Sequence, residues 1–118
     1  MDEASLADLF IAFGEIRCRR MFGGLGVYAE GVMFALVAQG RLYLKADKAF
    51  ADELSSRGCE PFAYEARGRR VSLGYWSMPE AAFDDPEEAA ALARQALVLA
   101  HRAKAEAPRR RAPIPRTT

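Results

Sequence analysis

The chain has 118 residues, of which 51% are hydrophobic and 28% charged, with a formal net charge of +1. This length and composition predict one globular domain and exclude a disordered protein. The longest apolar runs are too short to cross a bilayer, and the start Met1-Asp2-Glu3 is acidic where a secretory signal would be basic. We therefore expect a cytoplasmic protein that makes no membrane contact.

Positive charge is concentrated at the C-terminus. Residues 108–118 contain four arginines and no acid, so residues 1–107 carry 13 basic and 16 acidic side chains, a net charge of −3. The same segment contains three prolines, which disfavour helices and strands. We expect a folded domain over residues 1–106 and a flexible arginine- and proline-rich tail over 107–118.

The first half of the chain predicts a helix and four strands. Apolar residues recur at helical spacing over residues 5–13, with Ser5 as the expected N-cap. From Ile16 the period changes to two, which predicts strands near residues 16–21, 27, 32–37 and 41–45. Glycines between these segments favour tight hairpins, so an antiparallel meander is expected.

The second half predicts two helices separated by a hairpin. Asp47 is a plausible cap for a helix over 48–56, and residues 62–64 and 71–76 alternate as strands around a charged loop. Acids and a proline near residue 86 predict a long final helix whose core stripe is Leu92, Ala96, Leu99 and Ala103. The order α-β(4)-α-β(2)-α predicts an α+β, two-layer fold: one antiparallel sheet of five to six strands with helices on one face.

The most informative segment is Arg19-Arg20-Met21-Phe22-Gly23-Gly24, in which apolar residues lead directly into a glycine pair. Glycine accepts positive φ, so Gly23 and Gly24 predict a sharp turn, and Gly31 a second one. With residues 31–35, 42–45, 61–64 and 71–75, this segment resembles the N-terminal domain of the TfoX/Sxy competence-regulator family. The resemblance covers residues 6–104.

That resemblance implies a fold similar to type III secretion chaperones. Two-domain members of the family add a C-terminal helical domain and act as transcriptional coactivators of DNA-uptake genes. For a single-domain chain the resemblance implies a regulatory or adaptor role, and it supplies no catalytic residue to carry over. We therefore expect a non-enzymatic module that binds another protein, with the transcription machinery as one source of partners.

Little in the sequence favours catalysis or a bound cofactor. The single histidine, His101, and the acids around residues 84–88 read as helix-end charges, and the glycines at 23, 24 and 26 lie between strands rather than before a helix. A small-ligand-binding or enzymatic domain is the third hypothesis, with Tyr43, Lys45 and Tyr64 as the nearest enzymatic candidates. We expect no metal and no cofactor.

Arginines and aromatic residues are the candidate binding groups. The arginines near the first turn are either solvated charges paired with nearby glutamates or a surface for an acidic partner or a nucleic-acid backbone. Tyr75 and Trp76 are adjacent on a strand and so point to opposite faces, which leaves one of them as a candidate anchor. A homodimer through an edge strand or open face is a further hypothesis. The partner-binding candidates are Arg17, Arg19, Arg20, Tyr75 and Trp76, and the phosphate-contact candidates of the tail are Arg109, Arg110 and Arg111.

Overall fold

The structure is a computed structural model that describes residues 1–21 and 23–106, without the side chains of residues 64–66 and 70–73. The predicted tail, including Arg109, Arg110 and Arg111, therefore lies outside the described residues. The elements in chain order are α1 (Glu3–Leu9), β1 (Arg17–Met21), β2 (Gly24–Ala29), β3 (Val32–Ala38), β4 (Arg41–Lys45), α2 (Lys48–Ser56), β5 (Pro61–Ala66), β6 (Arg69–Ser77), the 3-10 helix η1 (Glu80–Asp84) and α3 (Pro86–Glu106).

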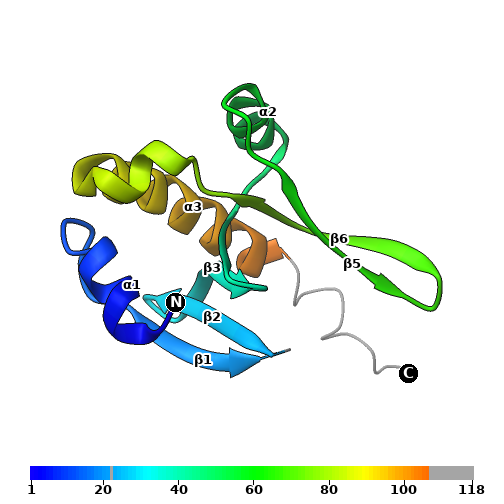
Figure 1. Ribbon diagram of the computed structural model, residues 1–118, viewed down its shortest axis with the longest axis horizontal. Helices are drawn as coiled ribbons and strands as arrows, with labels where there is room; N and C mark the ends of the chain where they lie inside the picture. The colour runs from blue at the N-terminus through cyan, green and yellow to red at the C-terminus, as the bar shows by residue number, and fades with distance from the viewer. Residues whose placement is uncertain (22, 107–118) are drawn as a thin grey trace.

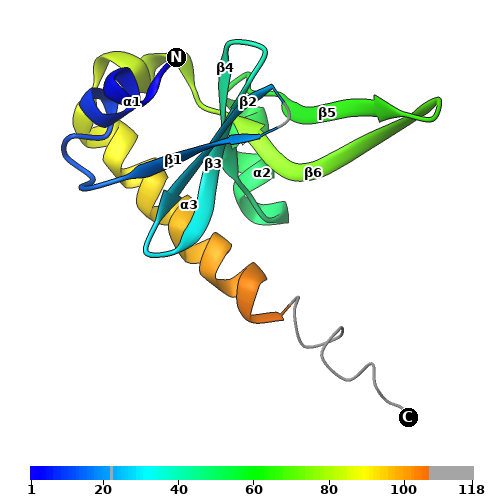
Figure 2. The ribbon, with the colours of Figure 1, turned by 90° about the horizontal axis from the view of Figure 1, so that it is seen from below.

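These elements form the predicted α+β fold. One antiparallel sheet has the strand order β1-β2-β3-β4-β6-β5, so β6 lies between β4 and β5. The side chains of all three α-helices contribute to the core on one face of this sheet. Figure 1 shows α1 and α3 on one side of the molecule, while the β5–β6 hairpin projects away from them, as Figure 2 also shows.

The core lies between the sheet and the helices. Its largest fully buried side chains come from α1, α2 and strands β2 to β4: Leu6, Phe10, Val27, Phe34, Leu42, Leu44, Phe50 and Leu54. Phe10 and Phe34 pack edge to face with ring centroids 5.6 Å apart, which fixes α1 on the sheet. This burial of apolar surface is the main stabilising contribution to the fold.

The helix ends show where local sequence rules were right and wrong. Asp47 caps α2 as predicted, because its carboxylate accepts a hydrogen bond from the Phe50 N–H at 2.9 Å. The first helix forms, but its predicted cap and bounds were wrong: Asp2, not Ser5, is the N-cap, and the helix ends at Leu9. Ser5 instead returns a side-chain contact to the Asp2 N–H at 3.1 Å, completing a capping box.

The two glycines of the first hairpin are required for different reasons. Gly23 has a φ of +76°, which disfavours any side chain. The φ of Gly24 is not positive, but a Cβ there would collide with the carbonyl oxygen of Val37 on β3. Gly31 has a φ of +82° in the β2–β3 turn, where the preceding Glu30 also has positive φ. Both central positions of that turn are therefore left-handed, as a type I′ hairpin demands.

Candidate interaction surface

Among the described residues, the sheet face opposite the helices carries a second, smaller apolar cluster. Strand register separates its side chains from the core, since alternate residues point to opposite faces. We call this surface the open face. It comprises Arg17, Arg19, Met21, Gly26, Tyr28, Met33, Leu36, Ala38, Arg41, Tyr43, Lys45, Phe62 and Tyr75.

Across strands β1 to β4, the charge of the open face is positive. Its four charged residues, Arg17, Arg19, Arg41 and Lys45, are all basic, and strands β1 to β4 contain no aspartate or glutamate at either face. The 16 acidic residues of the chain are therefore excluded from these four strands. An acidic partner would meet attraction and no repulsion from them.

Three of these cations lie over tyrosine rings. The guanidinium carbons of Arg19 and Arg41 stand 5.8 Å from the ring centroids of Tyr28 and Tyr43, respectively. Lys45 Nζ lies 5.1 Å from the Tyr75 ring centroid. Such contacts hold long cationic side chains against the sheet, so their charges are partly preorganised for binding.

The two predicted aromatic candidates lie on opposite faces, as adjacent strand residues must. Trp76 packs against the main core, whereas Tyr75 belongs to the open-face cluster and is 7% exposed. The Tyr75 hydroxyl donates to the Met33 carbonyl oxygen at 3.3 Å. Burial, with a smaller contribution from Tyr28, raises the pKa of Tyr75 to about 12. Tyr75 is thus a buried member of the open face, and its hydroxyl links β6 to β3.

Methionine provides the partly exposed apolar part of this surface. A Cβ on Gly26 would lie 2.8 Å from the sulfur of Met21 and 2.7 Å from that of Met33, so both thioethers fill the space above the glycine. Both side chains remain half-buried. Flexible, polarisable methionines suit a surface that adapts to a partner.

The predicted arginines are exposed, and they divide between the two faces as the alternation of strand residues predicts. Arg17 and Arg19 lie on the open face, whereas Arg20 stands opposite Leu25 on the other side of the strand. Arg17 approaches Glu15 at 3.9 Å, and both side chains are at least 80% exposed. An ion pair so exposed contributes little and leaves Arg17 able to change partners.

The sequence has a second group of arginines, Arg67, Arg69 and Arg70, at the β5–β6 hairpin. Arg67 has a φ of +57° in the β5–β6 turn, and Arg69 begins β6. Three strands separate β1 from β6 in the sheet order, so the two groups are not neighbours in the sheet. The side chain of Arg70 lies outside the described residues.

Contacts of the final helix were missed by the sequence reading. His101 Nε2 lies 2.8 Å from Glu30 Oε1, and Lys104 Nζ donates to the Gly31 carbonyl oxygen at 3.5 Å. These contacts tie the last turns of α3 to the β2–β3 turn. Separations of more than 70 residues gave no local signal for them.

The acidic cluster at the start of α3 acts as a helix cap. Asp85 Oδ1 accepts hydrogen bonds at 3.2 Å from the N–H groups of Glu87 and Glu88. Across the described part of the chain, no three His, Cys, Asp or Glu side chains are grouped to hold a metal ion. Nor is any helix within residues 1–21 and 23–106 long and apolar enough to span a membrane.

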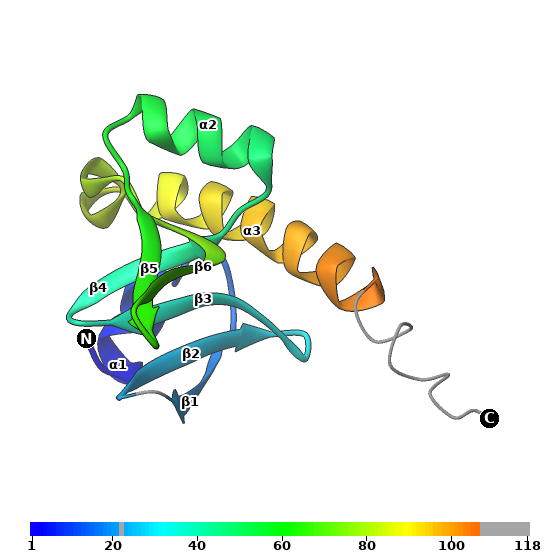
Figure 3. The same ribbon diagram turned by 90° about the vertical axis from the view of Figure 1, so that its right-hand side faces the viewer.

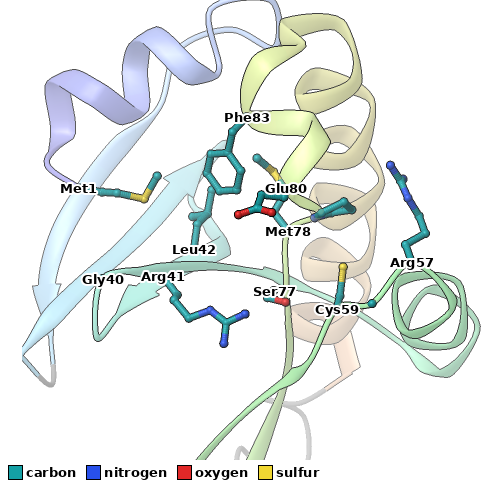
Figure 4. Close-up of a pocket in the computed structure, with 12 residues that line it drawn as sticks. Met1, Gly40, Arg41, Leu42, Arg57, Cys59, Ser77, Met78, Glu80 and Phe83 are labelled. Atoms are coloured by element: carbon teal, nitrogen blue, oxygen red, sulfur yellow. The ribbon is translucent and has the colours of Figure 1, made fainter.

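A cavity of about 400 Å³ lies where β4, the α2–β5 connection and η1 meet (Figure 4). The Ser77 hydroxyl on its floor accepts the N–H of Glu60 at 2.9 Å. Its two cationic side chains are already paired: Arg41 with Glu60 at 3.2 Å, and Arg57 with Glu88 at 2.8 Å. These pairs join β4 to the start of β5 and α2 to α3, so we assign this cavity a structural role.

Two of the three residues named as enzymatic candidates, Tyr43 and Lys45, make packing contacts within the open face. Tyr43 is 6% exposed and packs edge to face on Phe62, with ring centroids 5.1 Å apart. The ammonium group of Lys45 lies over the ring of Tyr75. The side chain of Tyr64 lies outside the described residues. Tyr43 and Lys45 therefore contribute packing and charge to the open face.

Comparison with known proteins gives one family and three named relatives. "DNA transformation protein TfoX1" of Aliivibrio fischeri is 29% identical over 83 residues, which cover 70% of this chain and 40% of that protein. "DNA transformation protein TfoX" of Haemophilus influenzae is 31% identical over 78 residues, covering 64% and 35%. "Protein Sxy" of Escherichia coli is 27% identical over 81 residues, covering 69% and 39%.

Each match spans two fifths or less of the relative's own length. The TfoX N-terminal domain matches residues 8–100, which include all six strands and most of α3. Because this match covers most of the chain, the protein belongs to the TfoX N-terminal domain family.

Proposed function

We propose that this chain is a non-enzymatic regulatory module that binds another protein through the open face and β1. The names of two relatives place them in DNA transformation, and we extend that role to this chain as control of genes for DNA uptake. The partner we propose is a protein of the transcription machinery. The matches span two fifths or less of those relatives' own length, so we propose for this chain a binding role and not their whole activity.

One observation carries the proposal: among the described residues, a sheet face that no helix covers combines half-buried methionines with four basic residues, and the glutamates paired with two of them, Glu15 and Glu60, lie outside the strands. Exposed apolar surface rimmed by charge is typical of protein interaction sites. Cations held over tyrosine rings bind a charged partner with less loss of side-chain freedom. The surface therefore suits recognition better than chemistry.

Affinity capture of partners tests this proposal. The tagged full chain is incubated with nuclease-treated cell extract of its own source, alongside an Arg19→Glu/Arg20→Glu variant. We expect a protein that is captured by the wild type and lost with the variant, because charge reversal turns attraction into repulsion. The matched control, Arg94→Glu/Arg102→Glu, makes the same charge change at exposed positions of α3 and should retain the partner.

Three results would contradict the proposal. Equal capture by all three chains would show that Arg19 and Arg20 do not contribute to partner binding. If the Arg19→Glu/Arg20→Glu chain fails to fold, these two residues stabilise the fold and are not shown to bind a partner. The third result favours the alternative, a nucleic-acid accessory protein that uses Arg17, Arg19, Arg20 and the tail. In that case untreated extract yields nucleic acid, which is released by salt and lost with Arg109→Ser/Arg110→Ser/Arg111→Ser.

A further inference from the structure

We infer that β1 accepts an acidic, extended segment of a partner protein as an additional strand of the sheet, with carboxylates placed against Arg17 and Arg19. The inference rests on the proposed function, because it names the chemistry of the partner and the edge that receives it. Strand addition of this kind uses backbone hydrogen bonds for affinity and alternate side chains for specificity.

The outer edge of β1 is open. β1 stands first in the sheet order and pairs only with β2. Among the described residues, Arg17–Met21 make no backbone hydrogen bond beyond the ladder with β2. Figure 3 shows β1 at the margin of the sheet, beyond β2. Such an edge presents unpaired N–H and C=O groups to an incoming strand.

The opposite edge of the sheet is less suited to this task. That edge is β5, which begins at Pro61. Proline has no N–H to donate, and it is a common residue on strand edges that do not pair. β1 contains no proline and no glycine, so every one of its residues can take part in a ladder.

Charge selects which strand this edge can accept. Arg17 and Arg19 are two residues apart and point to the open face, which also carries Arg41 and Lys45 on β4, beyond β2 and β3. Side chains directly opposite across two strands interact, and opposite charges stabilise the pair. An incoming segment with acidic residues at alternate positions would therefore place its carboxylates beside these two guanidinium groups.

A second copy of this chain is a poor occupant of the same edge. Pairing β1 with β1 about a two-fold axis would bring together two strands that each hold three arginines in five residues. Like charges opposite each other in a ladder are destabilising. The arginines thus protect the edge from self-association while leaving it attractive to an acidic strand.

Single-stranded nucleic acid fits this face less well than a peptide does. Sequence-tolerant binding of single strands relies on exposed aromatic rings that stack with bases. Tyr43 and Tyr75 are only 6% and 7% exposed, and Tyr28 lies beneath the Arg19 guanidinium. The cations are available, but the stacking surface is not.

A peptide titration tests the inference on the full-length protein. The probe is a blocked peptide of alternating glutamate and valine, added to isotopically labelled protein and followed by backbone amide chemical shifts and hydrogen exchange. We expect the largest shifts in Arg17–Met21 and slower exchange of the outward amides of β1. Arg17→Glu/Arg19→Glu should weaken binding about tenfold or more, while Arg94→Glu/Arg102→Glu should bind as the wild type does.

Two further probes separate strand addition from simple attraction of charges. The first peptide replaces three valines with proline and keeps every glutamate, and it should not bind because proline cannot donate to the ladder. The second replaces each glutamate with lysine and should not bind because its charge matches that of β1. Binding of either peptide as tight as that of the first probe would overturn the inference.

The remaining outcomes also decide the question. No shift in β1 at the highest soluble peptide concentration overturns the inference, as does displacement of the peptide by a thymidine oligonucleotide that binds more tightly at the same amides. Should the peptide fail while capture from extract still requires Arg19 and Arg20, strand addition is wrong and the proposed function stands. If capture of the partner from extract does not depend on Arg19 and Arg20, the proposed function is wrong as well.

Discussion

At the scale of single residues, the side chain required at a position, or its absence, is often set by a contact with a residue far away in the sequence. Gly24 is required by the Val37 carbonyl of another strand, although its own φ is not left-handed. Tyr75 supports the open face through its hydroxyl, which reaches Met33 two strands away. Such requirements depend on distance in space, so they were invisible in the local pattern of residues.

Tyr75 leads to a prediction about alkaline pH. Its pKa is raised from 10.0 to about 12, so the folded state holds the phenolic proton more tightly than the unfolded state does. This contribution to stability is complete below pH 10 and is lost as the pH rises from 10 to about 12. A shift of this size corresponds to roughly 2–3 kcal/mol.

The comparison is between the wild type and Tyr75→Phe, with the free energy of unfolding measured by urea denaturation across this pH range. Near neutral pH the variant should be less stable by about 1 kcal/mol, since the hydrogen bond to Met33 is lost. Above pH 10 the difference should shrink and then change sign before pH 12, because only the wild type has this proton to lose and that loss exceeds about 1 kcal/mol. Parallel curves up to pH 12 would show that burial does not hold the Tyr75 proton.

At the scale of secondary structure, local rules account for most elements. Predicted strands and helices all form, and α2 and β4 have the predicted bounds. In three hairpin turns, a residue with positive φ is followed by a glycine with positive φ: Glu30-Gly31, Gln39-Gly40 and Arg67-Gly68. Where the local rules failed, a tertiary or competing local contact was stronger, as when the Asp2 carboxylate replaced Ser5 as the cap of α1.

The β3–β4 turn provides a prediction at this scale. Gln39 has a φ of +54°, a conformation that costs most residues about 1–2 kcal/mol and that asparagine tolerates better. Gln39→Asn should therefore raise the free energy of unfolding by about 0.5 kcal/mol, as measured by chemical denaturation. Gln95→Asn is the matched control on the exposed side of α3, where asparagine is a poorer helix former and should lower stability by a few tenths of a kcal/mol. A loss of stability in the turn variant would contradict the type I′ assignment.

At the scale of the whole molecule, the close contact between α3 and the sheet depends on small residues. The buried face of α3 is mostly alanine: Ala89, Ala90, Ala93, Ala96 and Ala100, with Leu92 the one large buried side chain in this helix. The predicted stripe was right for Leu92 and Ala96, but Leu99 and Ala103 are only half-buried. The helix is rotated toward its alanines, because small side chains let its backbone approach β3 and β4.

Enlarging one of these alanines should separate the layers. Ala96 is fully buried, so Ala96→Leu should lower the free energy of unfolding by about 1–3 kcal/mol through overpacking. Val98 is 54% exposed on the same helix, and Val98→Leu should change stability by less than about 0.5 kcal/mol. Thermal and urea denaturation of both variants measures the difference. Equal effects would mean that the helix–sheet contact is looser than its burial indicates.

What the sequence by itself determined is the order and type of the elements, the α+β class and the family, because periodicity, turns and caps act over a few residues. Only the tertiary structure decided that β6 lies between β4 and β5, that the helices pack on the face opposite Arg17 and Arg19, and that His101 meets Glu30. These facts depend on pairing between segments far apart in the chain. The pairing of the strands creates the open face and leaves the outer edge of β1 unpaired. For this reason the sequence identified the arginines as candidates but did not predict the surface that they form.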